Sequence, residues 1–446
     1  MHIYHSYSTY QLFLRMMGVL VFPLTLLILF SMNLTAQVYQ VYVAAESDDV
    51  VQRVSFDANT YQGWVDATIS VGKLPTETEG PHGLILSSDK KHWFVTIAHG
   101  NPYGYLAKYS TQTHELMGTV DLGLFPASME ISEFTGLLYV VNFNLHGEME
   151  PSTMMIVDPE TMDLVAEMPT GIMPHGTRMN STGRKAYHVS MMSDELFEVD
   201  TYGFKIARRL SLALTEGSEL SSELPSEISN ETTTNANELE GLKELLDMDQ
   251  SSGSRMARMK EMNSHSTSGN HSHSTMQAGH DGNADRLEPM EHEAHMHGPT
   301  PHIKPTWADP HPNDAFVYVA GNGSDELIEI DVKKWAITRR IPTGKAPYNL
   351  EVSPNGKWLV SSLKGAFATS IVDISSGVEL AQIANSRRIS HGVAISSDSK
   401  YAFISVEGIG GESGSVDVIS LEELKRVAVI ETGKQAGGIS FFTTIE

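Results

Sequence analysis

An internal repeat constrains the fold of this chain more than any other feature. Six segments share one pattern: a Pro or Ser, two variable residues, an alternating apolar run, a polar turn and a second β-rich run. They start at residues 80, 125, 173, 304, 346 and 389, so all but one of the spacings lie between 42 and 48 residues. Alternation with a period of two on both sides of a tight turn is typical of a β-hairpin. Each repeat therefore contains at least two paired strands.

Two further β-rich runs follow the hairpin, as in residues 327–334 and 336–345. Four strands per repeat of this length are typical of one blade of a β-propeller. Residues 436–442 would supply the innermost strand of a seventh blade, and residues 40–73 would supply its other strands. Joining the two ends of the chain in one blade leaves no open sheet edge. We therefore predict an all-β fold, a seven-bladed β-propeller of four-stranded blades.

The repeat resembles a known family. Residues 347–357, PYNLEVSPNGK, and 318–322, YVAGN, are similar to the YVTN family of β-propeller repeats. That superfamily resembles the N-terminal propeller of nitrous oxide reductase, the d1-haem propeller of cytochrome cd1 and lactonase-type propellers. The resemblance implies the fold and leaves the function open, because propellers host unrelated chemistries. The chain has no Cys, so it carries neither a Cys-ligated copper domain nor a c-type haem motif.

The pattern of residues at the N-terminus is typical of an export signal. One cation precedes the apolar run 16–32, and a small residue, Ala36, follows it. This order predicts a signal peptide at 1–36 and an extracytoplasmic protein, periplasmic or secreted to the cell surface. An uncleaved membrane anchor is the alternative, and no later segment is apolar enough to span a membrane. The predicted domains are the signal peptide 1–36, blades within 37–212, an insertion at 213–302, and the remaining blades within 303–446.

The insertion has an unusual composition. It contains no aromatic residue and has 16 acidic against 5 basic residues, which predicts a mostly disordered segment. Its second half is rich in Met and His, which are soft and borderline metal ligands suited to copper. The predicted metal-capturing tether uses Met256, Met259, Met262, His271, His273, His292, His295 and His297. The alternative is a polar linker without a ligand.

Histidines also gather at one face of the predicted propeller. The loop that enters the first strand of a blade and the loop that leaves its second strand open on the same face. This rule brings together His82, His99, His146, His175 and His391, with His188 as a further candidate. Converging neutral imidazoles bind metals or transfer protons, and we expect copper first and zinc second. The alternative is that these histidines only hydrogen-bond neighbouring blades.

The remaining features narrow the function classes. A net charge of -24 argues against nucleic acid as a partner. Trp307 and Tyr348 lie at the same face and could stack on an organic ligand, while carboxylates there are few, with Glu148, Glu150 and Glu407 the nearest. We expect a protein that binds a metal ion or a small molecule at this face. The alternatives are a metalloenzyme, either an oxidoreductase or a lactonase-like hydrolase, and a metal-free scaffold that binds another protein.

Overall fold

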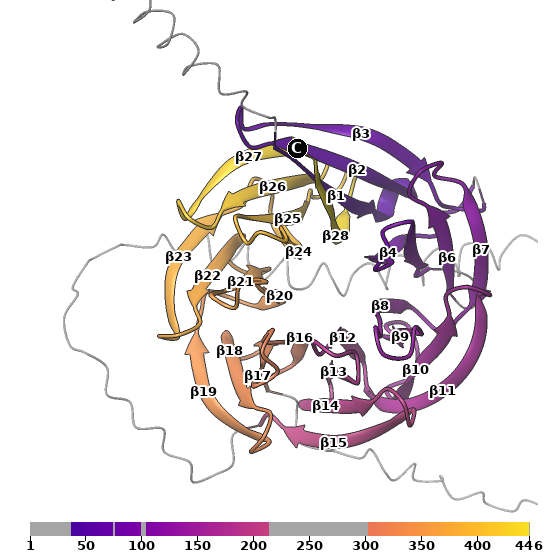
Figure 1. The fold of residues 1–446 in the computed structure, drawn as a ribbon, viewed down its shortest axis with the longest axis vertical. Coiled ribbons are helices and arrows are strands. Elements are labelled where there is room, and N and C mark those ends of the chain that lie inside the picture. The colour runs from indigo at the N-terminus through magenta and orange to yellow at the C-terminus, as the bar shows by residue number, and fades with distance from the viewer. Residues whose placement is uncertain (1–36, 75, 100–103, 214–301, 446) are drawn as a thin grey trace, which may run out of the picture. The chain divides into compact units, whose positions relative to one another are not determined.

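The computed structural model describes residues 37–74, 76–99, 104–213 and 302–445. These residues form 28 β-strands and one short 3-10 helix, η1 (Glu46–Asp48). The strands make seven antiparallel sheets of four strands each. The sheets stand around a common centre as blades (Figure 1). The predicted seven-bladed propeller is therefore confirmed.

The first strand of each blade lies next to the central channel, and the second strand pairs with it. The inner strands are β4 (Pro81–Leu86), β8 (Pro126–Ile131), β12 (Pro174–Met179), β16 (Pro305–Pro310), β20 (Pro347–Val352), β24 (Ile389–Ile395) and β28 (Ala436–Ile445). The second strands are β5 (His92–Ile97), β9 (Leu138–Asn142), β13 (Lys185–Ser190), β17 (Phe316–Gly321), β21 (Trp358–Leu363), β25 (Tyr401–Glu407) and β1 (Val38–Ala45). The predicted repeat starts fall within one residue of the inner-strand starts.

The two outer strands complete each blade. The third strands are β6 (Tyr105–Ser110), β10 (Pro151–Asp158), β14 (Glu195–Asp200), β18 (Glu326–Asp331), β22 (Ala368–Asp373), β26 (Ser415–Ser420) and β2 (Val50–Asp57). The fourth strands are β7 (Leu116–Asp121), β11 (Asp163–Ile172), β15 (Lys205–Ser211), β19 (Ala336–Pro342), β23 (Val378–Ala384), β27 (Lys425–Glu431) and β3 (Gln62–Ser70). Fourth strands such as β15 alternate between exposed and half-buried residues, because only one of their faces packs on a neighbour.

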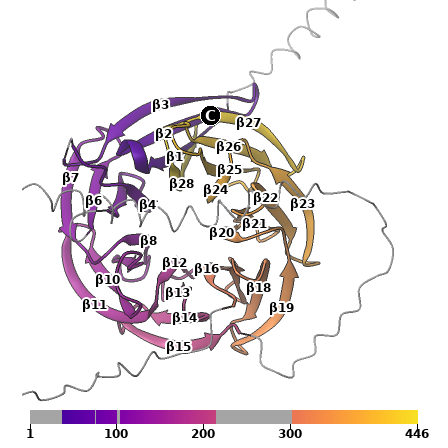
Figure 2. The ribbon, with the colours of Figure 1, turned by 180° about the vertical axis from the view of Figure 1, so that it is seen from behind.

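One blade combines both ends of the chain. Its strand order is β28-β1-β2-β3, and Ala45 at the end of β1 lies opposite Ala436 at the start of β28. The view from behind shows the C-terminal strand inside the three N-terminal strands of this blade (Figure 2). The predicted closure is confirmed, and it leaves the ring without a break between its first and last repeats.

The core lies between adjacent blades. Phe94 of β5, for example, packs in one buried cluster with Leu138 and Val140 of the next blade. Each blade therefore buries both faces against neighbours, which explains why second and third strands are apolar on both sides. This packing holds the seven inner strands at fixed positions around the channel.

Three predictions fall on other parts of the chain. The signal peptide 1–36 lies outside the described residues, and so does the insertion except for its two ends. All eight tether residues lie in that segment. Within the part that the structure describes, no helix has the length and apolar character needed to cross a membrane.

Candidate metal centre

A bulge at the start of the inner strands turns four aromatic side chains towards the channel axis. In β4, β12 and β20, the pairing with the second strand shifts immediately after the first residue, as between Pro81 and Leu84, and in β24 it shifts after the second residue, Ser390. The residues placed in this shift are His82, His175, Tyr348 and His391. A bulge re-aims the side chain at the point where it interrupts the ladder. We call this end of the channel the mouth.

The glycine after each of these histidines allows the next blade to pack closely against it. A Cβ on Gly83 would overlap the carbonyl oxygen of Ala127 in the next inner strand, and one on Gly176 would overlap Trp307. A Cβ on Gly392 would lie 2.9 Å from the carbonyl oxygen of Gly437. The observed approach is to the neighbouring blade, which brings the histidines of different blades together.

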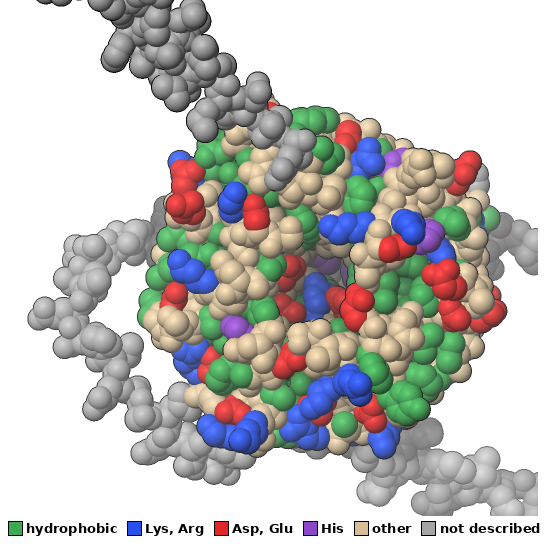
Figure 3. Space-filling view, in the orientation of Figure 1, with side chains coloured by type: hydrophobic (Ala, Val, Ile, Leu, Met, Phe, Trp, Pro, Cys, Tyr) green, Lys and Arg blue, Asp and Glu red, His purple; other side chains and the backbone are tan. Residues whose placement is uncertain are grey.

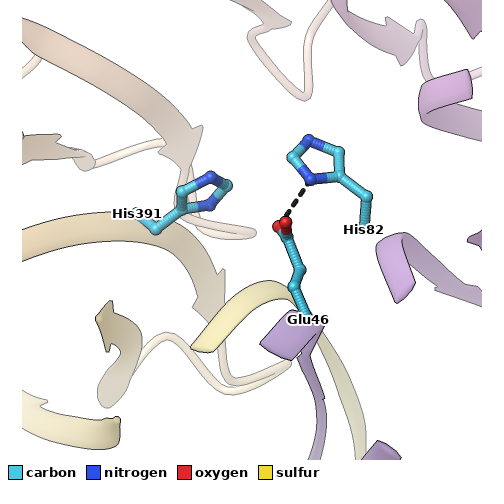
Figure 4. Close-up of side chains that lie close together, drawn as sticks. All are labelled: Glu46, His82 and His391. Atoms are coloured by element: carbon cyan, nitrogen blue, oxygen red, sulfur yellow. Dashed lines mark hydrogen bonds and ion pairs between the residues drawn. The ribbon is translucent and has the colours of Figure 1, made fainter. Parts of the chain in front are cut away.

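Three buried donors from three elements meet at the mouth. They are Glu46 of η1, His82 of β4 and His391 of β24, and one ligand atom of each lies within 4.8 Å of the others. The carboxylate of Glu46 accepts a hydrogen bond of 2.6 Å from His82 Nδ1, and Gln435 Nε2 donates to its other oxygen at 3.0 Å. Figure 4 shows the three side chains pointing towards one another. We call this group the Glu46–His82–His391 triad.

The His391 imidazole is the least satisfied member of the triad. It is 5% exposed, and among the described residues no group hydrogen-bonds to its Nδ1. Its Nε2 lies 3.8 Å from a carboxylate oxygen of Glu407, one of the acidic residues noted in the sequence. Burial, with Lys364 nearby, holds the pKa of His391 well below 6.5. The ring is therefore neutral at physiological pH, the form that binds a metal.

Sequence reasoning missed Glu46. This residue directly follows the second strand of its blade, in the position that Glu407 and Lys364 occupy in theirs. The rule that selected His99 and His146 would have found it, had the rule been applied to carboxylates as well as to histidines. The expectation that carboxylates are scarce at this face was therefore incomplete.

His175 has partners for both of its ring nitrogens. Its Nδ1 lies 3.0 Å from the carbonyl oxygen of Thr306 in the next blade, and its Nε2 lies 3.0 Å from the hydroxyl of Tyr348. Burial lowers the pKa of His175 to about 3. His175 thus hydrogen-bonds neighbouring blades, which is the alternative role that the sequence analysis gave for these histidines.

The other predicted histidines lie around this centre. His99 Nε2 is 4.0 Å from the second carboxylate oxygen of Glu46, and burial lowers the pKa of His99. The ring of His146 lies 5.9 Å from that of His99, but the residue is exposed. His188 lies away from the mouth, stacked on Phe197 at 4.7 Å in the same blade. The structure thus brings five of the six histidines to one region.

The two candidate stacking residues differ in exposure. Trp307 is only 8% exposed, and its ring centroid lies 5.4 Å from that of His175 and 5.0 Å from the Arg178 guanidinium carbon. Tyr348 is half-buried, with Lys364 Nζ 4.2 Å from its ring centroid. Tyr348 is therefore the one with a face nearer the solvent.

Charged side chains occupy the inner strands further from the mouth. The fifth residues of four consecutive inner strands are Glu130, Arg178, Asp309 and Glu351, which we call the floor cluster. Arg178 pairs with Glu130 at 3.1 Å, while Asp309 accepts a hydrogen bond from the Val352 backbone. Burial raises the pKa of Asp309 to about 7 and that of Glu351 to about 8. The space-filling view shows acidic, basic and histidine side chains in the hollow at the centre of the ring (Figure 3).

Comparisons with known proteins support the fold. No family model matches the chain, and no curated protein matches it. A protein from Lactobacillus plantarum has a TM-score of 0.59 at 12% identity, over 91% of this chain and 100% of that one. A proposed 6-phosphogluconolactonase from Bacteroides fragilis has a TM-score of 0.56 at 10% identity, over 93% and 99%. Kuenenia stuttgartiensis hydrazine synthase has a TM-score of 0.50 at 13% identity, over 79% and 80%.

Proposed function

We propose that this protein binds a divalent transition-metal ion at the mouth of its channel, through Glu46, His82 and His391. The observation that carries the proposal is the buried Nδ1 of His391, a residue of the triad, which has no hydrogen-bond partner among the described residues. Buried polar atoms without a partner are rare and ask for an explanation. A bound cation would use this nitrogen and would also balance the buried carboxylate.

The donor set limits the identity of the metal. Two imidazoles and one carboxylate, with no thiolate, suit zinc, copper and other first-row metals. Copper binds most tightly of these to a given set of nitrogen and oxygen ligands. We therefore propose copper as the preferred metal and zinc as its competitor.

The number of donors favours a metalloenzyme as the second candidate function. Three protein ligands leave at least one position on the metal for water or a substrate, as in catalytic zinc sites. This supports an oxidoreductase or a lactonase-like hydrolase over a closed storage site. The structural neighbours named as enzymes are only 10–13% identical, so they support the fold alone.

Export, the tether and the family remain proposals from sequence. We propose that the chain is exported and that the Met- and His-rich segment delivers metal to the mouth. Membership of the YVTN family is supported by residues 347–357, which fall on β20 and the turn that follows it. Deleting residues 254–302 should lower the metal content of protein purified from copper-limited cells. An unchanged metal content would remove the tether role and leave the triad untouched.

The test of the metal site is elemental analysis by mass spectrometry. The protein is purified without a His tag and incubated with equal amounts of Cu²⁺ and Zn²⁺, and the excess is removed. We expect near one metal per chain, and loss of that metal in the triple variant Glu46→Gln, His82→Ala, His391→Ala. His92→Ala, on a half-buried histidine that starts β5, is the matched control. Equal metal content in the triple variant and the control would refute the site, and a metal-free protein would favour the scaffold.

A further inference from the structure

Two of the predicted histidines lie beside the triad without belonging to it. His99 comes just after β5, and His146 comes just after β9 in the next blade. Their ring centroids are 5.9 Å apart, and the ring of Phe125 lies close to both, 4.9 Å from that of His99 and 5.7 Å from that of His146. The side chain of His99 is 28% exposed, and His146 is exposed. An ion from the solvent can therefore reach this pair.

The carboxylate of Glu46 offers one oxygen to each pair of histidines. Its Oε1 accepts the hydrogen bond of 2.6 Å from His82 Nδ1, on the side of the triad. Its Oε2 lies 4.0 Å from His99 Nε2 and accepts a hydrogen bond of 3.0 Å from Gln435 Nε2. Each carboxylate oxygen has two lone pairs, so the bond from Gln435 leaves Oε2 able to take a second partner. Glu46 can therefore serve the triad and His99 at the same time.

The gap between Glu46 and His99 has the size of a bound metal ion. At 4.0 Å, the distance from Oε2 to His99 Nε2 is too long for a hydrogen bond. An ion that binds both atoms at about 2.1 Å holds them about 3–4 Å apart, depending on the angle at the ion. Two imidazoles on one such ion have ring centroids about 5–6 Å apart. The observed 5.9 Å between His99 and His146 falls in that range.

The surroundings of His99 carry negative charge that a cation would balance. The backbone N–H of His99 donates to the carbonyl of Glu79 at 2.9 Å, and a Cβ on Gly80 would lie 2.4 Å from His99 Cδ2. The carboxylate of Asp49 accepts hydrogen bonds from the backbone N–H groups of Glu79 and Gly80. The carboxylate of Glu79 accepts two further backbone N–H groups. These bonds stabilise the carboxylates as anions without removing their charge.

We propose that a second divalent transition-metal ion, copper or zinc, binds His99, His146 and Oε2 of Glu46, so that Glu46 bridges two metal ions at the mouth. The first ion is that of the proposed function, on which this inference rests. His146 is the ligand that must turn towards the others, and as an exposed side chain it loses rotamer freedom when it binds. The second ion therefore binds more weakly than the first and leaves when excess metal is removed.

The test is a Cu²⁺ titration of the full chain, measured at equilibrium in the presence of free metal. Two Cu²⁺ ions bridged by one carboxylate couple magnetically and give a half-field transition in electron paramagnetic resonance, which isolated ions do not give. We expect this transition in the wild type at saturating Cu²⁺ and its loss in the double variant His99→Ala, His146→Ala. Equilibrium dialysis should show about one Cu²⁺ fewer per chain in the double variant.

The controls separate the second ion from other bound copper. The Met- and His-rich segment is present in every protein compared, so its copper cancels in the difference. His92→Ala, at the other end of β5, is the matched control and should keep the transition. The affinity for the first ion should change by less than about tenfold in the double variant, because His99 is too far from Glu46 to orient it by a hydrogen bond.

A single substitution keeps the test independent of folding. His146→Ala changes only an exposed side chain and should weaken the second ion more than about tenfold, since even an outer-shell contact is worth that much. Equal half-field signals in the wild type and the double variant, whether strong or absent, would overturn the inference and leave the triad standing. Loss of both ions from the double variant would show a single shared site and would also overturn it. Equal metal content in the wild type and the triple variant of the first test would overturn both proposals together.

Discussion

Counting the blades from the one that contains β4, His175 and His391 occupy the same position of blades three and six. Each is followed by Gly, yet their surroundings differ. His175 bonds the Thr306 carbonyl and the Tyr348 hydroxyl, so both of its nitrogens have partners. His391 Nδ1 has none among the described residues, and the His391 ring belongs to the group with Glu46 and His82. One repeat position therefore holds a structural histidine in one blade and a candidate metal ligand in another.

A residue of the second strand explains the difference. In blade six, Ser405 donates to the carbonyl of Gly437 in the next inner strand, and in blade one Thr96 bonds the Ala127 carbonyl at 3.3 Å. The corresponding position of blade three is Val189, which follows the His188–Thr177 pair in the ladder and has no hydroxyl. In this blade, the imidazole of His175 bonds the corresponding carbonyl of the next inner strand, that of Thr306. A hydroxyl in the second strand thus leaves the histidine available for other chemistry.

The largest effect should separate the two histidines by metal affinity. His391→Ala removes a proposed ligand and should weaken metal binding more than about 100-fold, beyond the usual effect of losing an outer-shell contact. His175→Ala removes no ligand and should change it by less than about tenfold. Competition with a chromophoric chelator measures both. Equal losses would mean that the two histidines play the same role.

Thermodynamic stability should rank them in the opposite order. His175→Ala leaves the Thr306 carbonyl and the Tyr348 hydroxyl without partners and should lower the free energy of unfolding by about 3 kcal/mol. His391→Ala breaks no hydrogen bond at Nδ1 and should cost about 1 kcal/mol less. Urea unfolding of the metal-free proteins measures this, with Glu115→Gln, a change at an exposed residue, as the neutral control. A larger loss in His391→Ala would contradict the assignment of His175 as the structural histidine.

Substitutions at Ser405 and Val189 test whether the second-strand hydroxyl determines the role of the histidine in its blade. Ser405→Val removes the partner of the Gly437 carbonyl, so His391 is drawn towards that carbonyl; we expect about 1–2 kcal/mol lower stability and weaker metal binding. Val189→Thr supplies the missing hydroxyl in blade three and should leave both quantities within about 0.5 kcal/mol of the wild type. Titration calorimetry measures the metal affinity, and urea unfolding measures the stability. Unchanged metal affinity in Ser405→Val would show that the hydroxyl does not control the histidine.

The propeller could be predicted from the sequence because the same strand pattern occurs in six repeats. The strands of each blade and the closure of the ring follow from this local pattern. The mouth was predicted only in outline. Topology brought His82 and His391 to one face, but it could not distinguish His175, because its role depends on a carbonyl 131 residues away in another blade. Glu46 was missed because the rule for the loop that leaves the second strand was applied to histidines and not to carboxylates.

The pH dependence of stability should have opposite signs at the two ends of the channel. His175 has a lowered pKa of about 3, so the unfolded chain binds its proton first and stability falls as the pH drops from about 6.5 towards 3. Glu351 has a raised pKa of about 8, so its contribution is full below about pH 4.5 and is lost as the pH rises towards 8. Glu351→Gln should reduce the slope of this upper branch only, to which Asp309 also contributes. His175→Ala should reduce the slope of the acid branch only, to which His188 and His391 also contribute. Urea unfolding at a series of pH values, with Glu115→Gln as control, measures both slopes. A variant that flattens the other branch would show that the mouth and the floor cluster titrate as one coupled system.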